Sequence, residues 1–307
     1  MKKFIADILV FSFCTLCVLF ILNYIVNYKT SQTDYYRLQF EELIHPKVKA
    51  NNVIIGTSHA TYGIEPGIIN KPKNSFYNFA LNGSNPEYQL RWYQTLFKTY
   101  YPKPQYMIIA VDWFLFDSQK LWRNFEQDAE YFPEKVYWNC LRSEETDKSM
   151  LLKNRYPIIK YRKTLLNELL VANSDRISLS EYDDGYIPSP TGEAPIENFI
   201  ETIQIDKNQQ QKFEELIKTI NNDQIKIILI VTPTYNTTPE AYKDIAVYSY
   251  FDSLACHYSI PYLNYNTQKV SHINLDKKYY ADGGHLNHLG STEFSKLLSK
   301  DLDNILK

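Results

Sequence analysis

Short apolar runs alternate with segments of helical periodicity from residue 52 to the C-terminus, and this alternation restricts the fold more than any other feature. The runs number five, and the last is the weakest: 53–55, 76–80, 106–111, 225–231 and 261–263. The first run ends at Gly56, as a buried strand does before a turn. Strands that alternate with helices form a parallel sheet covered by helices on both faces. We therefore predict an α/β fold with a mostly parallel sheet.

Three of the intervening segments have clear helical spacing. Pro86 follows Asn85 at a position suited to a first helical residue, and Ser291 is placed to cap the last helix. The apolar stripes of these helices are Leu90, Tyr93, Phe97 and Tyr100; Phe213, Leu216, Ile217 and Ile220; and Phe294, Leu297, Leu298, Leu302, Ile305 and Leu306. The last stripe is the longest, so the C-terminal helix is the clearest of the three.

The N-terminal stretch Ile8–Val26 carries no charge. About 20 apolar residues in a helix span the hydrocarbon core of a bilayer. Lys2 and Lys3 precede the stretch, and the positive-inside rule then keeps the tail in the cytoplasm and exports the rest. A cleaved signal peptide is the alternative, but the stretch is longer than a usual signal core and no small-x-small cleavage site follows it. We therefore predict that residues 1–30 form a cytoplasmic tail and a membrane-spanning signal anchor, with an extracytoplasmic functional domain.

Composition narrows the remaining choices. The 33 Lys and Arg residues balance 35 Asp and Glu residues, so the chain lacks the broad basic surface of a nucleic-acid binder. Cys14 and Cys17 lie inside the apolar stretch, where apolar filling explains them. Only Cys140 and Cys256 remain in the exported part, and a disulfide between them is permitted there but not established.

Residues 31–50 are expected to form a polar neck with a short helix. Ser31 and Asp34 resemble a capping pair at the start of this helix. The α/β domain is expected to follow at 51–307.

An insertion interrupts this domain at about 113–205, since roughly 90 residues separate the third and fourth strands where a few are usual. Within it we expect a helix over Lys160–Val171 and a loop over Asp183–Gly192. The insertion leaves the carboxyl end of a strand, so it should lie over the sheet edge where α/β proteins bind ligands. Aromatic side chains that it offers for stacking on a sugar are Trp113, Trp122 and Tyr186.

Two polar motifs directly follow predicted strands. Ser58, in Gly56-Thr57-Ser58-His59, lies at a strand-to-helix turn where its hydroxyl can stand above the sheet. Gly83 and Asn85, after the second strand, can offer a backbone amide and a side-chain donor to a substrate oxygen. Taken singly, each pattern is also explained by an ordinary turn or helix cap.

A third motif lies just before the last helix. Asp282 precedes His285 by three residues, and the paired glycines between them permit a turn that brings the carboxylate to the ring Nδ1. Such a contact fixes the tautomer and leaves Nε2 free to act as a base. A polar loop with a helix cap is the structural alternative. His288 lies beside the last helix and is expected to pack or to bond a loop carbonyl.

In this order, the three motifs resemble the SGNH (GDSL-type) hydrolase superfamily. Gly56-Thr57-Ser58 is similar to its first block, which places the nucleophile at Ser58. Gly83 is similar to the oxyanion donor of the second block. Asp282 and His285 match the terminal Asp-x-x-His. The resemblance covers about 52–307 without the insertion, and it implies a flavodoxin-like three-layer α/β/α sandwich with a Ser-His-Asp triad.

The chain also departs from the superfamily pattern. Thr57 stands where the first block often has Asp, and Val111-Asp112-Trp113 replaces the third block, Gly-x-Asn-Asp. The side-chain donor of the oxyanion hole is therefore open between Asn85 and Asn82. An N-terminal anchor and a large insertion resemble the membrane-anchored branches, which include the protein that assists D-alanylation of lipoteichoic acid and the partners of membrane-bound O-acyltransferases.

The resemblance implies a membrane-anchored serine esterase or O-acyltransferase that acts on acyl esters of cell-envelope glycans, with acetyl as the expected group. The implied partners are the acylated polysaccharide and a membrane-bound O-acyltransferase. His59 is expected to contact substrate rather than to act as the base. A non-catalytic glycan-binding or assembly protein that keeps the fold is the alternative.

No cofactor is expected. Asp282, His285 and His288 have ligand-like spacing, so a metal site is the alternative to a triad. A zinc site needs three or four convergent ligands, and His59 is the one plausible addition. We therefore expect a triad and no metal.

Overall fold

The computed structural model describes residues 1–31, 34–48, 50–117, 119–163, 183–189, 204–235 and 246–306. The chain divides into two compact units. The smaller contains Met1–Arg37 and Phe125–Leu179, and the larger contains Leu38–Asn124 and Ser180–Lys307. The predicted insertion is therefore shared between the units, and its expected placement over the sheet edge stays a prediction.

The larger unit contains a five-stranded parallel sheet in the order β2-β1-β3-β4-β5. All five predicted strands are confirmed, with these bounds: β1 (Asn52–Ile55), β2 (Phe76–Asn78), β3 (Tyr106–Ala110), β4 (Lys226–Val231) and β5 (Tyr262–Asn264). The chain runs from β1 to β2 on one side and then crosses to β3 on the other. The carboxyl ends of β1 and β3 therefore form the switch point at which open α/β sheets place ligands.

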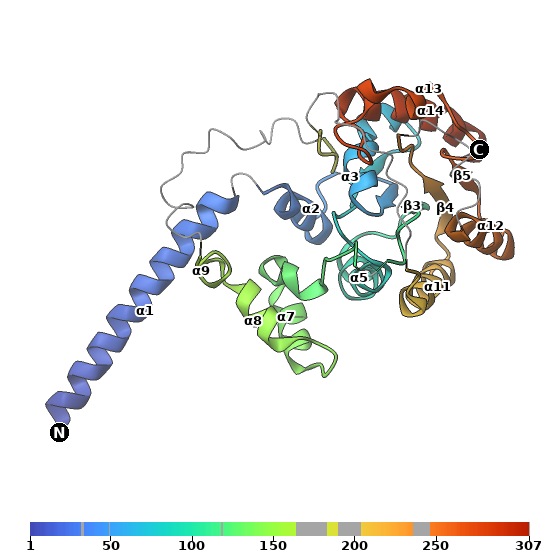
Figure 1. Ribbon diagram of the computed structural model, residues 1–307. Helices are drawn as coiled ribbons and strands as arrows, with labels where there is room; N and C mark the ends of the chain where they lie inside the picture. The colour runs from blue at the N-terminus through green and yellow to red at the C-terminus, as the bar shows by residue number, and fades with distance from the viewer. Residues whose placement is uncertain are drawn as a thin grey trace. The chain divides into compact units, whose positions relative to one another are not determined.

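Helices cover both faces of the sheet, as predicted for an α/β sandwich (Figure 1). One face carries α3 (Ser58–Gly63), α4 (Pro66–Ile69), α13 (His272–Leu275) and α14 (His288–Ile305), with the 3₁₀ turn η6 (Lys277–Tyr279). The other carries α5 (Pro86–Trp92), α11 (Lys207–Asn222) and α12 (Ala246–Tyr258). In Figure 1, α14 and α11 lie on opposite sides of the strands.

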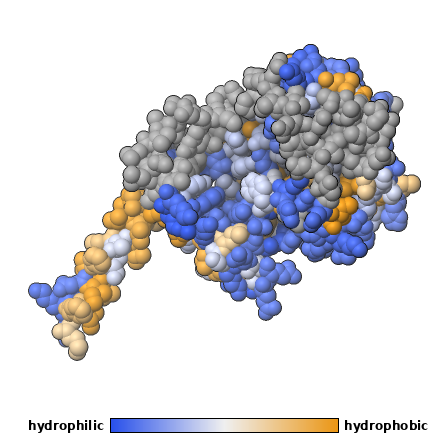
Figure 2. Space-filling view, in the orientation of Figure 1, coloured by the Kyte–Doolittle hydropathy of each residue, from blue (hydrophilic) through white to orange (hydrophobic). Residues whose placement is uncertain are grey.

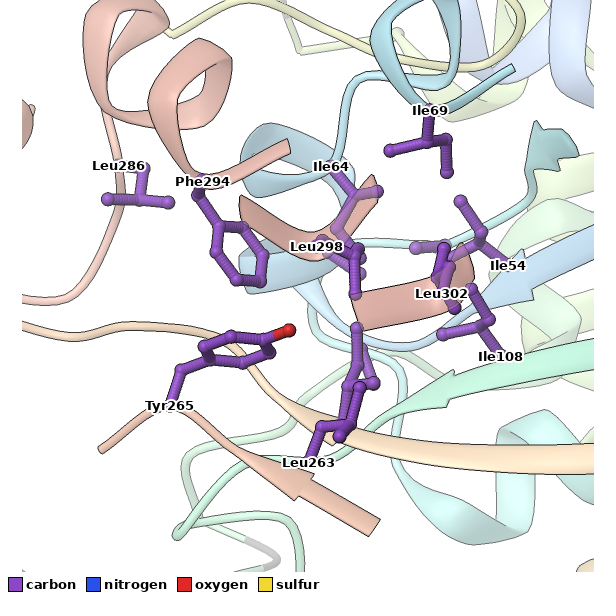
Figure 3. Close-up of a cluster of buried hydrophobic side chains, with 14 of the residues drawn as sticks. Ile54, Ile64, Ile69, Ile108, Leu263, Tyr265, Leu286, Phe294, Leu298 and Leu302 are labelled. Atoms are coloured by element: carbon purple, nitrogen blue, oxygen red, sulfur yellow. The ribbon is translucent and has the colours of Figure 1, made fainter. Parts of the chain in front are cut away.

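The core beneath α14 follows from helical and strand periodicity. Phe294, Leu298 and Leu302 recur every four residues and are buried. They belong to the same apolar cluster as alternate strand residues such as Ile54 and Ile108 (Figure 3). Because successive strand side chains point to opposite faces, the intervening strand residues serve the layer of α5, α11 and α12.

The ends of the helices show where the sequence interpretation needs correction. The cap of α14 is Asn287, whose side chain accepts a hydrogen bond from the N–H of Gly290 at 3.0 Å. The expectation that Ser291 caps this helix is wrong, since Ser291 is buried in the first turn and donates its hydroxyl to the carbonyl of His288. Asn287 begins the helix earlier because its amide also donates to the carbonyls of Lys278 and Tyr280.

The predicted helix that begins at Pro86 is present, but a π-helical turn interrupts its α-helical hydrogen bonding. It consists of α5, one π-helical turn, η1 (Tyr93–Phe97), and α6 (Lys98–Tyr100). Asn85 caps α5, accepting from the N–H of Tyr88 at 2.8 Å. The π turn leaves the aromatic side chains of this segment buried.

The predicted neck contains α2 (Tyr35–Ile44). From Leu38 onward this helix belongs to the larger unit. The buried amide of Gln39 donates to the carbonyls of Asn78, Ala80 and Gly185, at 3.0, 3.3 and 3.2 Å. The C-terminal part of the neck is therefore integrated in the α/β unit.

The smaller unit contains α1 (Lys2–Ser31), η2 (Phe125–Tyr131), α7 (Glu134–Arg142), α8 (Lys148–Arg155) and α9 (Pro157–Lys160). Its α1 is long and apolar enough to cross a membrane over Lys2–Lys29, with a mean hydropathy of 2.6 in its most apolar 18-residue stretch, and Figure 2 shows the apolar surface along it. Most of the helix expected over Lys160–Val171 lies outside the described residues. In the described part, α9 ends at Lys160 and residues 161–163 form a turn. Of the loop expected over Asp183–Gly192, residues 183–189 are described and form a turn.

Candidate active site

Ser58 lies where β1 turns into α3. Gly56 makes this turn with a φ of +153°, and a Cβ there would lie 2.9 Å from both the Cβ and the carbonyl oxygen of Ala110 on β3. Thr57 is the N-cap of α3, and Ser58 is its first residue. The strand end, the glycine and the cap therefore place the hydroxyl of Ser58 at the carboxyl edge of the sheet, half-buried.

Ser58 meets the loop before α14, although 227 residues separate it from His285 in the chain. The Nε2 atom of His285 lies 2.8 Å from Ser58 Oγ. On the other side of the ring, Nδ1 lies 2.8 Å from Asp282 Oδ2 and 3.0 Å from Oδ1. The serine, histidine and aspartate thus form a continuous hydrogen-bonded relay.

Backbone amides shape the aspartate end of this relay. Asp282 Oδ1 accepts hydrogen bonds from the N–H groups of Gly284 at 2.9 Å and His285 at 2.8 Å. Burial raises the pKa of Asp282, but the His285 side chain and these two amides outweigh that effect and hold the pKa below its usual range. The carboxylate therefore stays ionised and keeps the imidazole oriented.

The loop after β2 is joined to the Ser58 turn through one carbonyl oxygen. The carbonyl of Gly56 accepts the N–H of Leu81 at 3.0 Å and the hydroxyl of Ser84 at 2.9 Å. Between these two residues, Gly83 has a φ of +71°, and a Cβ on it would lie 2.8 Å from the indole ring of Trp122. Within the described residues, no acceptor takes a hydrogen bond from the N–H of Ser58 or of Gly83.

The two asparagines of this loop have different surroundings. The Oδ1 of Asn85 is occupied by its capping bond to Tyr88, so this side chain serves the start of α5. Asn82 instead donates its amide to the hydroxyl of Tyr62, whose ring lies edge-on to His285 with centroids 5.6 Å apart. Asn82 is therefore the asparagine connected to the histidine of the relay.

A second histidine–carboxylate pair, which sequence reasoning missed, lies beneath the first. Nδ1 of His59 is 2.9 Å from Asp112 Oδ1, and Thr57 donates its hydroxyl to the other carboxylate oxygen. His59 and Asp112 are both buried, and the rings of His59 and His285 meet edge to face with centroids 4.9 Å apart. One signal could have revealed the pair: Asp112 lies two residues after the end of β3, which lies beside β1 in the sheet.

The buried carboxylate controls the proton affinity of His59. Burial alone lowers the pKa of this imidazole, but the negative charge and hydrogen bond of Asp112, with a further contribution from Asp282, outweigh it and raise the pKa above 6.5. A proton on His59 thus neutralises a carboxylate that would otherwise be buried and unpaired.

The residues considered as substrate contacts fall into two groups. Trp113, Tyr186 and His59 are buried, so the structure does not present their rings to solvent. The hydroxyl of Tyr186 lies 2.6 Å from Ser291 Oγ and 3.1 Å from His288 Nδ1. His288 therefore packs against Tyr186 and, among the described residues, does not bond a loop carbonyl through this nitrogen. Trp122, in contrast, is 61% exposed and lies over Gly83.

No protein-family profile matches this sequence, and no curated protein sequence matches it. Several solved structures are similar to it at low identity. One, from Streptococcus pneumonia and provisionally described as a platelet activating factor, has a TM-score of 0.45 and 12% identity, over 94% of this chain and 99% of that one. Another, provisionally described as an acylhydrolase from Bacteroides fragilis NCTC 9343, has a TM-score of 0.42 and 14% identity, over 89% and 96%.

A third is a GDSL-like lipase from Bacteroides thetaiotaomicron VPI-5482, with a TM-score of 0.40 and 14% identity over 90% of this chain and 98% of that one. Identities of 12–14% and TM-scores of 0.40–0.45 do not assign a function to this chain.

The raised pKa of His59 predicts a pH-dependent contribution to stability. A raised pKa in the folded protein adds stability that is complete below the unfolded value, about 6.5, and is lost as the pH rises through the folded value. The difference in unfolding free energy between the natural protein and His59→Gln should therefore be largest below about pH 6.5. Urea denaturation of the detergent-solubilised protein across pH 5 to 9 measures it.

The exposed histidine His45 supplies the control for this measurement. His45→Gln replaces an exposed side chain and should change the unfolding free energy by no more than about 0.5 kcal/mol. A difference for His59→Gln that is constant with pH would show that His59 does not change its proton occupancy on unfolding.

Proposed function

We propose that this chain is a membrane-anchored, extracytoplasmic serine esterase or O-acyltransferase of SGNH type. The observation that carries the proposal is the relay from Ser58 through His285 to Asp282, with contacts of 2.8 Å on each side of the imidazole. Its position at the carboxyl edge of a parallel sheet, next to the switch point, is where such folds act on ligands.

The relay supports nucleophilic attack on an ester carbonyl. Ser58 Oγ attacks the carbonyl carbon while Nε2 of His285 takes the hydroxyl proton. Asp282 holds the Nδ1–H and stabilises the imidazolium that forms. The same imidazolium then protonates the leaving alcohol, which leaves an acyl group on Ser58.

Negative charge on the carbonyl oxygen needs donors that are already in place. The N–H of Ser58, in the first turn of α3, and the N–H of Gly83 are the backbone donors proposed for this oxyanion. Asn82 is a side-chain donor on the same loop, next to Tyr62 and His285. Asn85 is left to cap α5.

The proposed substrate is an acyl ester, with acetyl as the expected group, on a cell-envelope polysaccharide. Support comes from α1, which would hold the domain at the membrane surface, and from the exposed indole of Trp122 beside Gly83. Hydrolysis and transfer share the acyl-enzyme, and they differ in whether water or a sugar hydroxyl accepts the acyl group. Transfer would bring in a membrane-bound O-acyltransferase as a partner that supplies it.

Substitution of the relay tests the proposed chemistry. Ser58→Ala and His285→Ala should each lower turnover of a small acetyl ester by about 10⁴-fold or to background. Asp282→Asn should be severely impaired because it favours the wrong tautomer of His285. Release of p-nitrophenol from its acetate ester measures each variant.

His288→Ala is the matched control for the histidine assignment, since it lies three residues away and contacts Tyr186. It should keep most of the activity. A dead His288→Ala beside an active His285→Ala would reverse the assignment. Failure of a fluorophosphonate probe to label Ser58 in the folded protein would favour the non-catalytic glycan-binding alternative.

Trp122 provides a test of the glycan substrate. Trp122→Ala should raise KM for an acetylated polysaccharide by about three- to tenfold, as expected for loss of an aromatic contact. Turnover of p-nitrophenyl acetate should stay within about twofold, because the ring does not belong to the relay. Trp138→Ala removes another exposed tryptophan and is the control. Equal losses on both substrates would assign Trp122 to the structure of the site and not to glycan binding.

The anchor is tested by topology and extraction. A reporter enzyme that is active only outside the cytoplasm, fused after Lys307, should be active, because Lys2 and Lys3 keep the N-terminus inside. The full chain should remain in the membrane fraction after carbonate washing. Release of a shortened soluble form would instead identify α1 as a cleaved signal.

A further inference from the structure

The smaller unit has a basic and apolar surface on α8, α9 and the turn after them. The segment Lys148–Lys163 contains six basic residues and no acidic residue. The exposed basic residues are Lys148, Lys153, Arg162 and Lys163. Between them, the side chains of Leu152, Tyr156 and Ile159 are 46, 46 and 41% exposed. Apolar and basic groups thus share one short segment.

The two remaining basic residues of this segment are used by the fold. Arg155 donates to the carbonyls of Ala129 and Phe132 at 3.1 and 2.7 Å. Lys160 pairs with the buried carboxylate of Glu130. Arg162 donates only to the exposed carbonyl of Ile159, and none of the four exposed basic residues has a buried partner among the described residues, so their concentration here needs another explanation.

Contacts with the C-terminal end of α1 fix the position of this surface along the α1 axis. The side-chain oxygen of Asn23 accepts the N–H of Ile158, in the first turn of α9, at 3.1 Å. Val26, three residues further along α1, is fully buried. Arg37 donates to the side-chain oxygen of Asn27 at 2.7 Å. Protein therefore covers one side of α1 before its apolar stretch has ended.

The rise per residue of an α-helix gives the depth in the bilayer at which α9 contacts α1. At 1.5 Å per residue, Ile8–Val26 is about 28 Å long, close to the hydrocarbon thickness of about 30 Å. Asn23 lies about 4.5 Å before the end of this stretch. If α1 spans the bilayer, α9 meets it where acyl chains give way to headgroups. Tyr24 and Tyr28 are exposed on α1 at this level, as in the aromatic belts of membrane proteins.

We propose that the α8–α9 surface lies on the outer face of the membrane and binds anionic phospholipid. Leu152, Tyr156 and Ile159 would insert among the headgroups and upper acyl chains, while the exposed basic side chains meet lipid phosphates. A bilayer accounts for both the apolar and the basic groups, whereas a partner helix would account for the apolar ones alone. The inference rests on the proposed anchoring by α1, and it does not depend on the esterase activity.

Site-specific fluorescence in lipid nanodiscs tests the contact. The full chain carries Cys14→Ala, Cys17→Ala and Cys256→Ser, with buried Cys140 kept, and one new cysteine bears an environment-sensitive label. A label at Leu152→Cys should be blue-shifted, and lipids spin-labelled near the headgroup should quench it in nanodiscs that contain phosphatidylglycerol. A label at Leu275→Cys, on a leucine of α13 that is 53% exposed and lies outside the basic segment, should show neither effect.

Charge reversal tests the role of the basic residues. Each reversed charge should weaken the association of the surface with phosphatidylglycerol by about fivefold or more. The pair Arg162→Glu and Lys163→Glu should therefore remove most of the quenching at position 152, while nanodiscs of phosphatidylcholine alone should give weak quenching with or without the pair.

Two further labels keep the outcomes distinct. A label at Val18→Cys, in the middle of α1, reports whether the anchor spans, and turnover of an acetyl ester reports the active site separately. If position 18 is quenched by deep spin labels and position 152 behaves like position 275, the proposal is overturned. It is also overturned if position 152 is unquenched in nanodiscs but protected from an aqueous quencher in native membranes, which would identify a membrane protein as the occupant.

Discussion

The geometry of the candidate active site depends on the carbonyl group of Gly56. It accepts hydrogen bonds from Leu81 and Ser84 on the loop after β2, and the absence of a Cβ lets the same residue pack against Ala110 on β3. Three neighbouring strand ends are thereby brought together at one glycine. Ser58 follows two residues later, so these contacts of Gly56 fix its distance from the Gly83 loop, and the hydroxyl of Thr57 joins the same turn to Asp112.

Two histidine–carboxylate pairs in contact with each other occupy different environments. Asp112 and His59 are buried, and Asp112 raises the proton affinity of its partner. Asp282 and His285 are partly open to solvent, with side chains 58% and 29% exposed. Burial makes the inner pair sensitive to the loss of either partner, since an unpaired charge would remain in the interior. The inner pair therefore supports the surface against which the His285 ring packs, while in the proposed mechanism the more exposed outer pair exchanges protons with substrate.

Sequence reasoning recovered the elements whose signals are local. All five strands were predicted because each is a short apolar run, and α14 was predicted because Phe294, Leu298 and Leu302 repeat at helical spacing. The start of α14 was misplaced because Asn287 is held by carbonyls of the preceding turn, which no local pattern shows. Asp112 was missed as a partner of His59 for the same reason: 53 residues separate them, and only the order of strands brings them together.

The exposure of the outer relay bears on the kind of substrate that fits it. A hydrogen bond between His285 and Asp282 is weakened by water, and it strengthens when a bound molecule excludes that water. A small ester would leave much of the Asp282 carboxylate solvated, whereas a polymer lying along the edge of the sheet would cover it. Trp122, exposed and in contact with Gly83, supplies an apolar surface on which a sugar ring can rest next to the proposed oxyanion donor. If the substrate is the proposed glycan, its binding beyond the ester would strengthen the relay at the reacting bond, and contacts remote from the chemistry can raise turnover in this way.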